Sequence, residues 1–470
     1  MQIDSLDALS PLDGRYAEKV ADLRPIFSER GLMQRRIRMQ CMYLLALSEH
    51  PDIPLRKLTD SEKEHIGRLP SVSLEDARVI KQIEKEGYRG KPKTEHDVKA
   101  TEYYARFSFE GVPSLADVTE WYRFGLTSED DNNIAYALQL REGLEYHLLP
   151  VFTTVHEGIR ALAKDHATLA MLARTHGQPA SPTTFGKEMA VFDSRLNRKR
   201  AKLAAFRILV KLNGATGGYN AHVSAFPNVD WMQFTKDFVS SLNGPEQTIL
   251  FEPNLITTQV EPHDTYAELF DLLKEICTIL SSFCEDMWRY ISDDWVALRA
   301  AVGEIGSSVM PWKVNPINFE NAEGNLDMAA AICEFFARKL PRMRLQRHLS
   351  DSTVIRHFGA LFGQILLACK EIRTGLGKIA PNAFVIRSAL EQHPEVIAEA
   401  YQTILRREGL NDPYKQLSEL TRGKHITLEG LRYFVRSLAV RPEVQAELLA
   451  LEPAKYIGLA DKLALLEDAP

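Results

Sequence analysis

The sequence predicts an all-α protein built on long helices. In several segments, apolar residues recur at alternating spacings of three and four over about seven turns, which is the pattern of long helices packed in a bundle. Alternation with the period of a strand is almost absent. With 470 residues the chain also exceeds one ordinary domain, so two or three domains that share long elements are expected.

Five segments carry the helical pattern, and local signals mark their ends. They are 149–162, 185–210, 266–290, a stretch from 317 to Pro341, and 355–376. Ser181 before Pro182 is typical of an N-cap with proline at the first helical position, and Thr265 with Glu268 fits a capping box. A glycine-rich run ends the second segment and a proline ends the fourth. Rods of this length suggest a bundle shared within an oligomer.

The helical patterns become shorter and more interrupted towards both ends of the chain. We therefore expect an N-terminal helical domain (1–117), a central domain of long bundled helices (118–376) that carries most of the polar motifs, and a C-terminal helical domain (377–470). The basic segment 87–93 lacks both the spacing of a phosphate-binding loop and a preceding strand, so it is expected to be an exposed loop.

Composition excludes several classes of protein. The net charge of −6 argues against a nucleic-acid binder, which needs a basic face to displace counterions. The first residues show neither a basic start nor an apolar run, and apolar stretches meet charges or Gln before they reach membrane-spanning length. Five cysteines without a CxxC pair fit a reducing cytoplasm. No HExxH or Cys/His cluster occurs, so no metal is expected.

One glycine-bounded segment, Gly303 to Asn325, combines donors suited to a carboxylate. It contains paired serines followed by Lys313 and Asn315, and its glycines allow backbone N–H groups to approach an anion. A flexible linker would be the simpler interpretation of the Gly-Ser-Ser run alone, but it does not account for the whole G-S-S-x-M-P-x-K-x-N-P string.

Histidines are the natural candidates for acid and base work near neutral pH. The chain has 13, and those beside glycine-rich or capping turns stand out, namely His96, His176 and His263. From the residues alone, His96 would be chosen as the base. His263 with Asp264 is better explained as the start of a helix.

At this point a family resemblance becomes clear. The G-S-S-x-M-P-x-K-x-N-P string resembles the signature of the fumarase/aspartase superfamily, whose members eliminate fumarate from succinyl-containing substrates. Six further motifs, in the same order, resemble adenylosuccinate lyases: S-P-L-D-G-R-Y at 10–16, T-S-E-D at 127–130, T-H-G-Q-P at 175–179, T-T-Q-V-E-P-H-D at 257–264, D-S-T-V-I-R at 351–356 and E-L-T-R-G-K at 419–424. The likeness covers nearly the whole chain. Trp312, where close relatives often carry His, and the 87–93 insertion are small departures.

The resemblance implies a cofactor-free lyase that releases fumarate from adenylosuccinate to give AMP and from SAICAR to give AICAR. It implies a three-domain fumarase/aspartase-like fold, a cytoplasmic homotetramer, and active sites formed by three chains. His176 matches the general acid and Ser307 the general base, which must be activated because a free hydroxyl is a very weak acid. His96 and Asp97 then orient the substrate.

The remaining matched positions are expected to contact the nucleotide substrate. Those around the nucleotide and its phosphate are Arg15, Tyr16, Ser352, Thr353, Val354, Ile355 and Arg356; those near the succinyl group and the loop are Glu95, Thr127, Ser128, Gln259, Ser308, Lys313, Val314, Asn315, Asn321 and Arg347. Thr127 and Ser128 could also be simple helix caps.

Two alternatives stay open at the level of sequence. One is another fumarate-releasing lyase of the superfamily, such as argininosuccinate lyase, fumarase or aspartase, against which T-H-G-Q-P and the motifs around Arg15 and Arg356 argue. The other is a non-catalytic protein that has kept this scaffold, against which the presence of His176, Ser307 and Lys313 argues.

Overall fold

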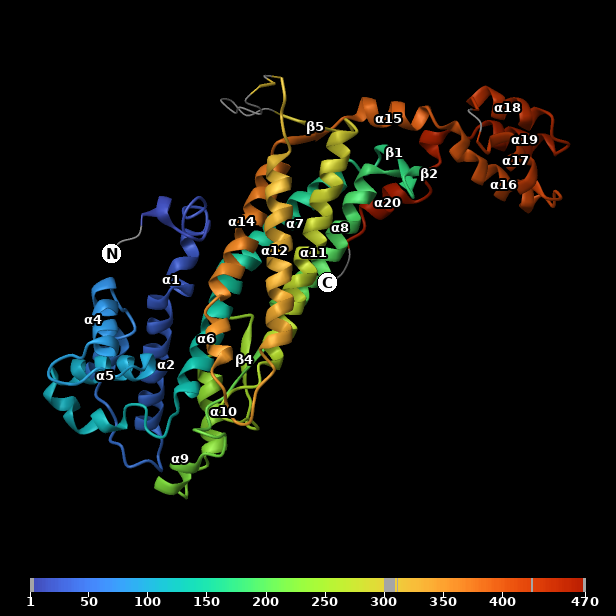
Figure 1. Ribbon diagram of the computed structural model, residues 1–470. Coiled ribbons are helices and arrows are strands. Elements are labelled where there is room, and N and C mark those ends of the chain that lie inside the picture. Colours follow the sequence, from blue (N-terminus) through green and yellow to red (C-terminus); the bar gives the residue numbers. More distant parts are fainter. Residues whose placement is uncertain (1–3, 300–308, 311, 424–425, 468–470) are drawn as a thin grey trace. The chain divides into compact units, whose positions relative to one another are not determined.

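The computed structural model describes residues 4–299, 309–310, 312–423 and 426–467. As predicted, the described chain is mainly helical, and its strands form three two-stranded sheets (Figure 1). The helices are α1 Arg24–Phe27, α2 Glu29–Glu49, α3 Asp60–Arg68, α4 Leu74–Lys85, α5 Asp97–Phe109, α6 Ser128–Gly143, α7 Leu149–Asp165, α8 Phe185–Ala204, α9 Asn220–Ala225, α10 Trp231–Ser241, α11 Asp264–Ser292, α12 Ile317–Lys339, α13 Ser350–Ile355, α14 Phe358–Leu376, α15 Ala383–Glu391, α16 Ala398–Arg407, α17 Pro413–Thr421, α18 Leu428–Arg436, α19 Pro442–Leu449 and α20 Ala460–Ala464.

The strands pair locally. They are β1 Ala170–Thr175, β2 Gln178–Thr184, β3 Arg207–Val210, β4 Leu250–Pro253, β5 Val296–Leu298 and β6 Ile379–Pro381. The β1–β2 and β5–β6 pairs are antiparallel, whereas β3 and β4 are parallel. A π-helical turn, Leu144–Leu148, joins α6 to α7, and short 3-10 helices occupy Ser5–Asp7, Ala21–Leu23, Pro113–Trp121, Pro394–Ile397 and Pro453–Lys455.

The chain divides into two compact units. Unit 1 comprises 1–152, 199–278 and 325–369, and unit 2 comprises 153–198, 279–324 and 370–470. The division into the domains 1–117, 118–376 and 377–470 stays a prediction.

An aromatic core holds the helices of unit 1 together. Phe270 of α11, Phe336 of α12 and Phe358 of α14 are buried, and their ring centroids lie 5.0–5.3 Å apart. Close helix approach also depends on Gly143, where a Cβ atom would lie 2.6 Å from the Phe27 ring. Any side chain there would push the N-terminal segment off the bundle.

Aromatic contacts also organise unit 2. Phe283 of α11 packs edge-to-face against Phe192 of α8 and Phe319 of α12, with centroids 5.4 and 6.2 Å away. Gly375 of α14 lies over the Phe319 ring, because a Cβ atom there would come within 2.8 Å of it. The apolar stripes recognised in the sequence therefore line the core of each unit.

Four predicted helix boundaries are wrong. The segment expected as one helix over 185–210 ends as α8 at Ala204, because the β-prone run Arg207–Val210 pairs with β4 instead. Ser181 and Pro182 lie in β2, and Thr184 caps α8 by accepting a 3.1 Å hydrogen bond from the N–H of Lys187.

The other two differences concern α11 and α14. Helix α11 begins at Asp264, as expected for His263 and Asp264, but Thr265 lies inside it and accepts from the N–H of Leu209 at 3.2 Å, so it is not the N-cap. The expected helix over 355–376 is interrupted after Ile355, and α14 starts at Phe358. By length and composition the stretch Ser350–Leu376 could cross a membrane, contrary to the sequence expectation, but 56% of its apolar window is buried inside the protein, as in a core helix.

Candidate active site

The centre of the candidate site in unit 1 is Asp97, at the first position of α5. One carboxylate oxygen lies 3.0 Å from Nη2 of Arg36 on α2 and 2.7 Å from Nη2 of Arg356, directly after α13. Burial acts to raise the pKa of Asp97, but Arg36 and Arg356 outweigh it and hold that pKa well below its ordinary value. Asp97 is therefore ionised throughout the neutral range.

Arg36 continues the network into α6. Its Nε donates to Oδ1 of Asn132 at 2.9 Å, and the Asn132 amide donates to Glu129 at 2.8 Å. The Glu129 carboxylate pairs with Nη1 of Arg347 at 2.6 Å. Since Arg36 and Glu129 are almost fully buried, their charges require these partners.

Arg347 in turn reaches the segment before α11. Its Nη1 donates to the side-chain oxygen of Gln259 at 3.2 Å, while the Gln259 amide donates to the carbonyl of Ala215. Beneath them the fully buried Lys211 donates to Asp130 at 2.8 Å and to the carbonyl of Gln259 at 2.9 Å. The orientation of Gln259 is thus fixed at both its side chain and its backbone.

The start of α6 lies beside His96. Thr127 is the N-cap, and its N–H donates to the side chain of Asp130 at 2.9 Å, so the capping role expected for Thr127 is present. The hydroxyl of Ser128, the first helical residue, lies 3.4 Å from Nε2 of His96. His96 is itself the N-cap of α5, because its Nδ1 accepts from the N–H of Lys99 at 3.4 Å.

Glu95 has a different environment. Its backbone has a left-handed φ of 49°, and its exposed carboxylate pairs with Lys93 at 2.5 Å. The expected 87–93 loop is indeed a surface turn, closed by a bridge between Tyr88 and Lys91. The contact expected between Glu95 and substrate stays a prediction.

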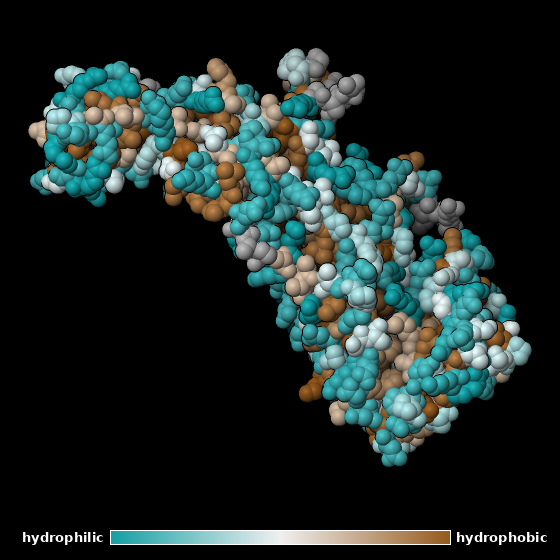
Figure 2. All heavy atoms as spheres, turned by 180° about the vertical axis from the view of Figure 1, so that it is seen from behind, coloured by the Kyte–Doolittle hydropathy of each residue, from teal (hydrophilic) through white to brown (hydrophobic). Residues whose placement is uncertain are grey.

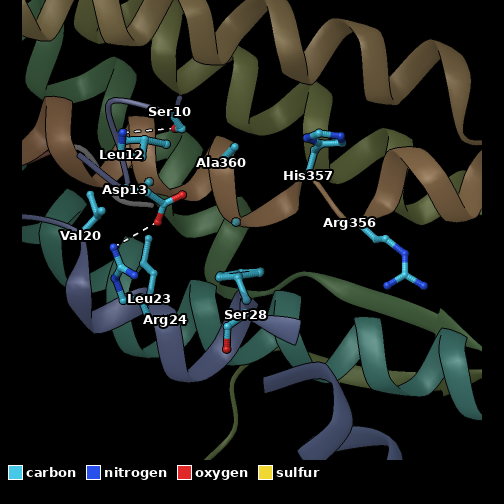
Figure 3. Close-up of a pocket in the computed structure, with 13 residues that line it drawn as sticks. Ser10, Leu12, Asp13, Val20, Leu23, Arg24, Ser28, Arg356, His357 and Ala360 are labelled. Carbon is cyan, nitrogen blue, oxygen red and sulfur yellow. Dashed lines mark hydrogen bonds and ion pairs between the residues drawn. The ribbon is translucent and has the colours of Figure 1, made fainter. Parts of the chain in front are cut away.

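A cavity of about 480 Å³ lies in unit 1, lined by residues of the N-terminal segment and of the start of α14. Figure 3 shows these residues. Asp13 and Arg24 form a 3.1 Å ion pair on one side, and Arg356 lies on the other. Of the S-P-L-D-G-R-Y motif, Ser10, Leu12 and Asp13 line the cavity.

Arg15 and Tyr16 lie outside this lining. The Arg15 guanidinium is 5.9 Å from the centroid of the Tyr16 ring. On α13, Thr353 is exposed, Ser352 and Val354 are half-buried, and Ile355 is buried. The substrate contacts expected for Arg15, Tyr16 and 352–355 stay predictions.

In unit 2, His176 lies at the tip of the β1–β2 hairpin. Thr175 pairs with Gln178, so the loop consists of His176 and Gly177, with φ values of 53° and 74°. Positive φ at both central residues is the geometry of a type I′ turn, whose twist matches that of the strands. Histidine is uncommon in this conformation, and the turn presents the exposed imidazole beyond the strand ends.

The loop motif also belongs to unit 2, but Ser307 and Ser308 lie outside the described residues. Lys313 and Val314 are exposed, and the N–H of Lys313 donates to the carbonyl of Met310. Asn315 is half-buried just before α12, and Asn321 is half-buried in its second turn. Trp312 is 78% exposed.

The structure therefore brings six expected residues into one network or against it. These are His96, Asp97, Ser128, Gln259, Arg347 and Arg356. The residues that hold them were not predicted from the sequence; they are Arg36, Glu129, Asn132 and Lys211. Arg36, Glu129 and Asn132 are polar residues within helices, and Lys211 follows β3, so the sequence alone gives no sign that these four side chains are buried. Within the described residues no group of three or more His, Cys, Asp or Glu side chains could hold a metal ion.

Comparisons with known proteins identify the family of the chain. A family model described as lyase matches residues 14–330, and one described as adenylosuccinate lyase C-terminal matches 343–457. Adenylosuccinate lyases from Escherichia coli K12 and Haemophilus influenzae are each 43% identical to the chain, and that from Dictyostelium discoideum is 40% identical. The alignments cover 98% of this chain and 98–99% of each relative.

Solved structures support the fold. A 3-carboxy-cis,cis-muconate lactonizing enzyme from Pseudomonas putida matches with a TM-score of 0.71 at 19% identity, covering 95% of both chains. A fumarate lyase from Mesorhizobium sp. BNC1 matches with a TM-score of 0.72 at 18% identity, covering 94% of this chain and 96% of that one. From its site motifs, its family models and its full-length relatives, the chain belongs to the adenylosuccinate lyase family of the fumarase/aspartase superfamily.

Proposed function

We propose that the chain is a C–N lyase that eliminates fumarate from adenylosuccinate to give AMP, and from SAICAR to give AICAR. The observation that carries this proposal is identity of 40–43% to adenylosuccinate lyases over 98% of the chain. The site chemistry agrees, since Arg347 and Arg356 are positioned by carboxylates in a chain whose net charge is −6. Such a protein must gather its cations locally to bind a substrate with one phosphate and two carboxylates.

The reaction needs a base at carbon and an acid at nitrogen. A base removes the proton from the succinyl carbon beside a carboxylate, the electrons form the fumarate double bond, and the C–N bond breaks towards nitrogen. Protonation of that nitrogen then releases the product amine. Ser307 is proposed as the base, activated by backbone N–H groups and Lys313, and His176 as the acid.

The hairpin geometry supports the role of His176. Its imidazole is exposed at the tip of a turn, where it is accessible to a substrate. His96 is less suited to act as the base, because Nδ1 caps α5 and Nε2 faces the Ser128 hydroxyl. His96 and Asp97 are therefore proposed to orient the substrate.

The assembly and compartment are also part of the proposal. We propose a cytoplasmic homotetramer in which segments around His96, His176 and Ser307 from three chains complete each active site. Contacts from Arg15, Tyr16, Glu95, Thr127, Ser128, Gln259, Ser308, Lys313, Val314, Asn315, Asn321, Arg347 and 352–356 complete substrate binding.

A direct assay tests the function. The purified protein should turn over adenylosuccinate and SAICAR, followed by ultraviolet absorbance, and should leave argininosuccinate, malate and aspartate unchanged. Steady turnover of one of the latter three without turnover of adenylosuccinate would reverse the assignment. No turnover of any of them would favour a scaffold protein.

The same assay tests the catalytic roles. His176→Ala and Ser307→Ala should each lower kcat by ~10²-fold or more, the usual loss for a removed acid or base. His393→Ala is a matched control in unit 2, because His393 is half-buried beside another element, where it pairs with Glu395. Near-native turnover in either of the first two variants would remove the proposed role of that residue.

A further inference from the structure

The hairpin that carries His176 contains a bulge between its base and its tip. The pairing of β1 with β2 is interrupted in the middle, where Leu172 alone stands opposite both Ser181 and Pro182. One residue against two is the arrangement of a β-bulge, which bends the strand, increases its twist and often lies next to an active site. The bulge therefore sets the direction in which the turn at His176 points.

This bulge separates a buried base from an exposed tip. The base, 170–172 and 182–184, is buried, whereas the tip, 174–178, is exposed. The strands pack against α15 and α20 of the same unit, which lie beside the hairpin in Figure 1. Because the tip is exposed, the packing of its own side chains constrains its direction less than the contacts of the base and the bulge do.

Glu399 on α16 holds the bulge. The hydroxyl of Ser181 donates a hydrogen bond to Oε2 of Glu399, and the hydroxyl of Tyr456 donates to the same oxygen at 2.9 Å. Burial and the bond to Glu399 raise the pKa of Tyr456 to about 12, so this hydroxyl stays a donor throughout the neutral range. Glu399 thus joins the bulge both to α16 and to the segment that follows the 3-10 helix Pro453–Lys455.

A small rotation at the bulge is enough to displace the imidazole from a reacting atom. Gly177, in the turn, lies four residues from Ser181, which is about 13 Å at ~3.3 Å per residue of strand. A rotation of the outer hairpin by about 5° would move the turn by about 1 Å, and a misplacement of about 1 Å can cost on the order of 10²-fold in rate.

We propose that Glu399 and Tyr456 are positioning residues for His176. Through Ser181 they fix the bulge, and so they fix the direction of the imidazole towards the nitrogen that leaves. Both act through the hairpin and not by contact with substrate. The inference rests on the proposed function for the role of His176 as the acid, and it gives a catalytic consequence to two residues that no motif selected.

The first experiment compares two substitutions of Glu399 in steady-state kinetics. Glu399→Ala removes the acceptor of both hydrogen bonds, so kcat should fall by about tenfold with KM for adenylosuccinate near the wild-type value. Glu399→Gln should retain most of kcat, because its amide oxygen can accept from both hydroxyls. Tyr456→Phe should lower kcat by about threefold, since one of the two bonds remains. Wild-type kcat in Glu399→Ala would overturn the inference.

A double-mutant cycle then tests whether Glu399 acts through His176. In a His176→Ala background, Glu399→Ala should have no further effect on kcat, because the side chain that it positions is gone. A tenfold loss in both backgrounds would show that Glu399 acts on another group and would reject the inference. Near-native turnover in His176→Ala alone would reject the acid role itself, and absence of turnover in the wild type would reject the proposed function before any variant is compared.

Glu408→Ala is the matched control. Glu408 follows the last residue of α16, and its carboxylate pairs with Arg407 and Arg441. This variant should keep the wild-type kcat. If Glu408→Ala and Glu399→Ala lowered both Tm and kcat by the same amounts, the effect of Glu399 would come from stability and not from the direction of the hairpin.

Discussion

Asp97 shows how one carboxylate can organise a cationic site without titrating near neutral pH. Arg36 and Arg356 together keep it ionised, although burial acts in the other direction. A group of this kind orients its neighbours and does not exchange protons in the working range. The pH dependence of catalysis should therefore come from other groups.

Arg36 should be a positioning residue for substrate binding. Arg36→Lys keeps a positive charge near Asp97 but cannot also donate from Nε to Asn132, so the link to Glu129 and Arg347 is lost. We expect KM for adenylosuccinate to rise about tenfold with a smaller change in kcat. Steady-state kinetics measures both constants.

Arg35 offers the control on the same helix. It is equally buried but bonds the carbonyls of Pro25 and Gly31 and pairs with Glu142. Arg35→Lys should lower Tm and leave KM near the wild-type value. Equal changes of KM in the two variants would show that Arg36 acts only through stability.

Asp131 should make stability depend on pH. It is fully buried, and burial raises its pKa from 3.8 to about 6 even though Arg123 lies 2.5 Å away. Because the folded state holds the proton more tightly than the unfolded state, this stabilisation is complete below about pH 4 and is lost as the pH rises to about 6. Urea unfolding as a function of pH should show this component in the wild type and not in Asp131→Asn.

Asp60→Asn, a substitution of an exposed aspartate, should keep the same pH dependence of stability as the wild type. A pH profile of Asp131→Asn that parallels the wild type between pH 4 and 6 would contradict the assignment.

The residues of the site were only partly predictable from sequence. His96, Asp97, Gln259, Arg347 and Arg356 were found because motif resemblance selected them, and the structure connects them. Arg36 and Lys211 could not be found, since their function depends on burial and on partners about 60 to 80 positions away in sequence. Ser307 stays a prediction.

Among the elements, the β1–β2 hairpin depends most clearly on one residue type, because its turn needs a glycine at position 177. Gly177→Ala should destabilise the turn by ~1 kcal/mol, because an L-residue at φ 74° is strained even though open space surrounds the position. If His176 is the acid, its displacement should also lower kcat by roughly tenfold or more. Kinetics and thermal unfolding measure the two effects.

Gly409 provides the matched substitution. Its φ of 78° is close to that of Gly177 and open space surrounds both positions, but Gly409 lies in the turn between α16 and α17. Gly409→Ala should destabilise the protein about as much as Gly177→Ala, with no loss of kcat. If both variants have wild-type kcat, the hairpin tip does not position the acid.

Sequence periodicity predicted the long helices better than their ends. Leu149–Asp165 and Ile317–Lys339 agree with the apolar stripes, because these stripes pack in the cores. The helix start predicted at Ser181 is wrong, because pairing of β2 with β1 outweighs the capping preference of Ser181. The helix predicted to continue over 207–210 is wrong, because the apolar residues of this segment fit a short parallel strand equally well.

At the scale of the whole molecule, the proposal that chains share active sites predicts complementation between inactive variants. Mixing inactive His176→Ala and Ser307→Ala proteins should restore part of the activity if different chains supply the acid and the base. The mixed sample must first be shown to exchange subunits. Verified exchange without recovery would mean that one chain supplies both groups.

Exposed apolar side chains on α12 predict where another chain packs. Most of the surface visible in Figure 2 is hydrophilic with separate apolar patches. Met328 and Phe335 are 56% and 41% exposed and lie seven positions apart, so they share a helix face. Replacing both with Asp should dissociate the proposed tetramer in sedimentation velocity.

Tyr433→Asp is the control for this substitution. Tyr433 is 75% exposed on α18 and should tolerate a charge without a change of assembly. An intact tetramer in the double Asp variant would exclude this face of α12 as a subunit contact.

The cysteines of the folded protein should react very slowly with thiol reagents. All five cysteines are buried and none forms a disulfide, and burial raises the pKa of Cys41 and of Cys277 to about 12, so the native protein presents almost no thiolate. An alkylating reagent should therefore spare folded molecules and mark each opened chain at several positions. Mass spectrometry after a brief pulse would then count opened molecules directly, for any variant, whether or not it retains activity.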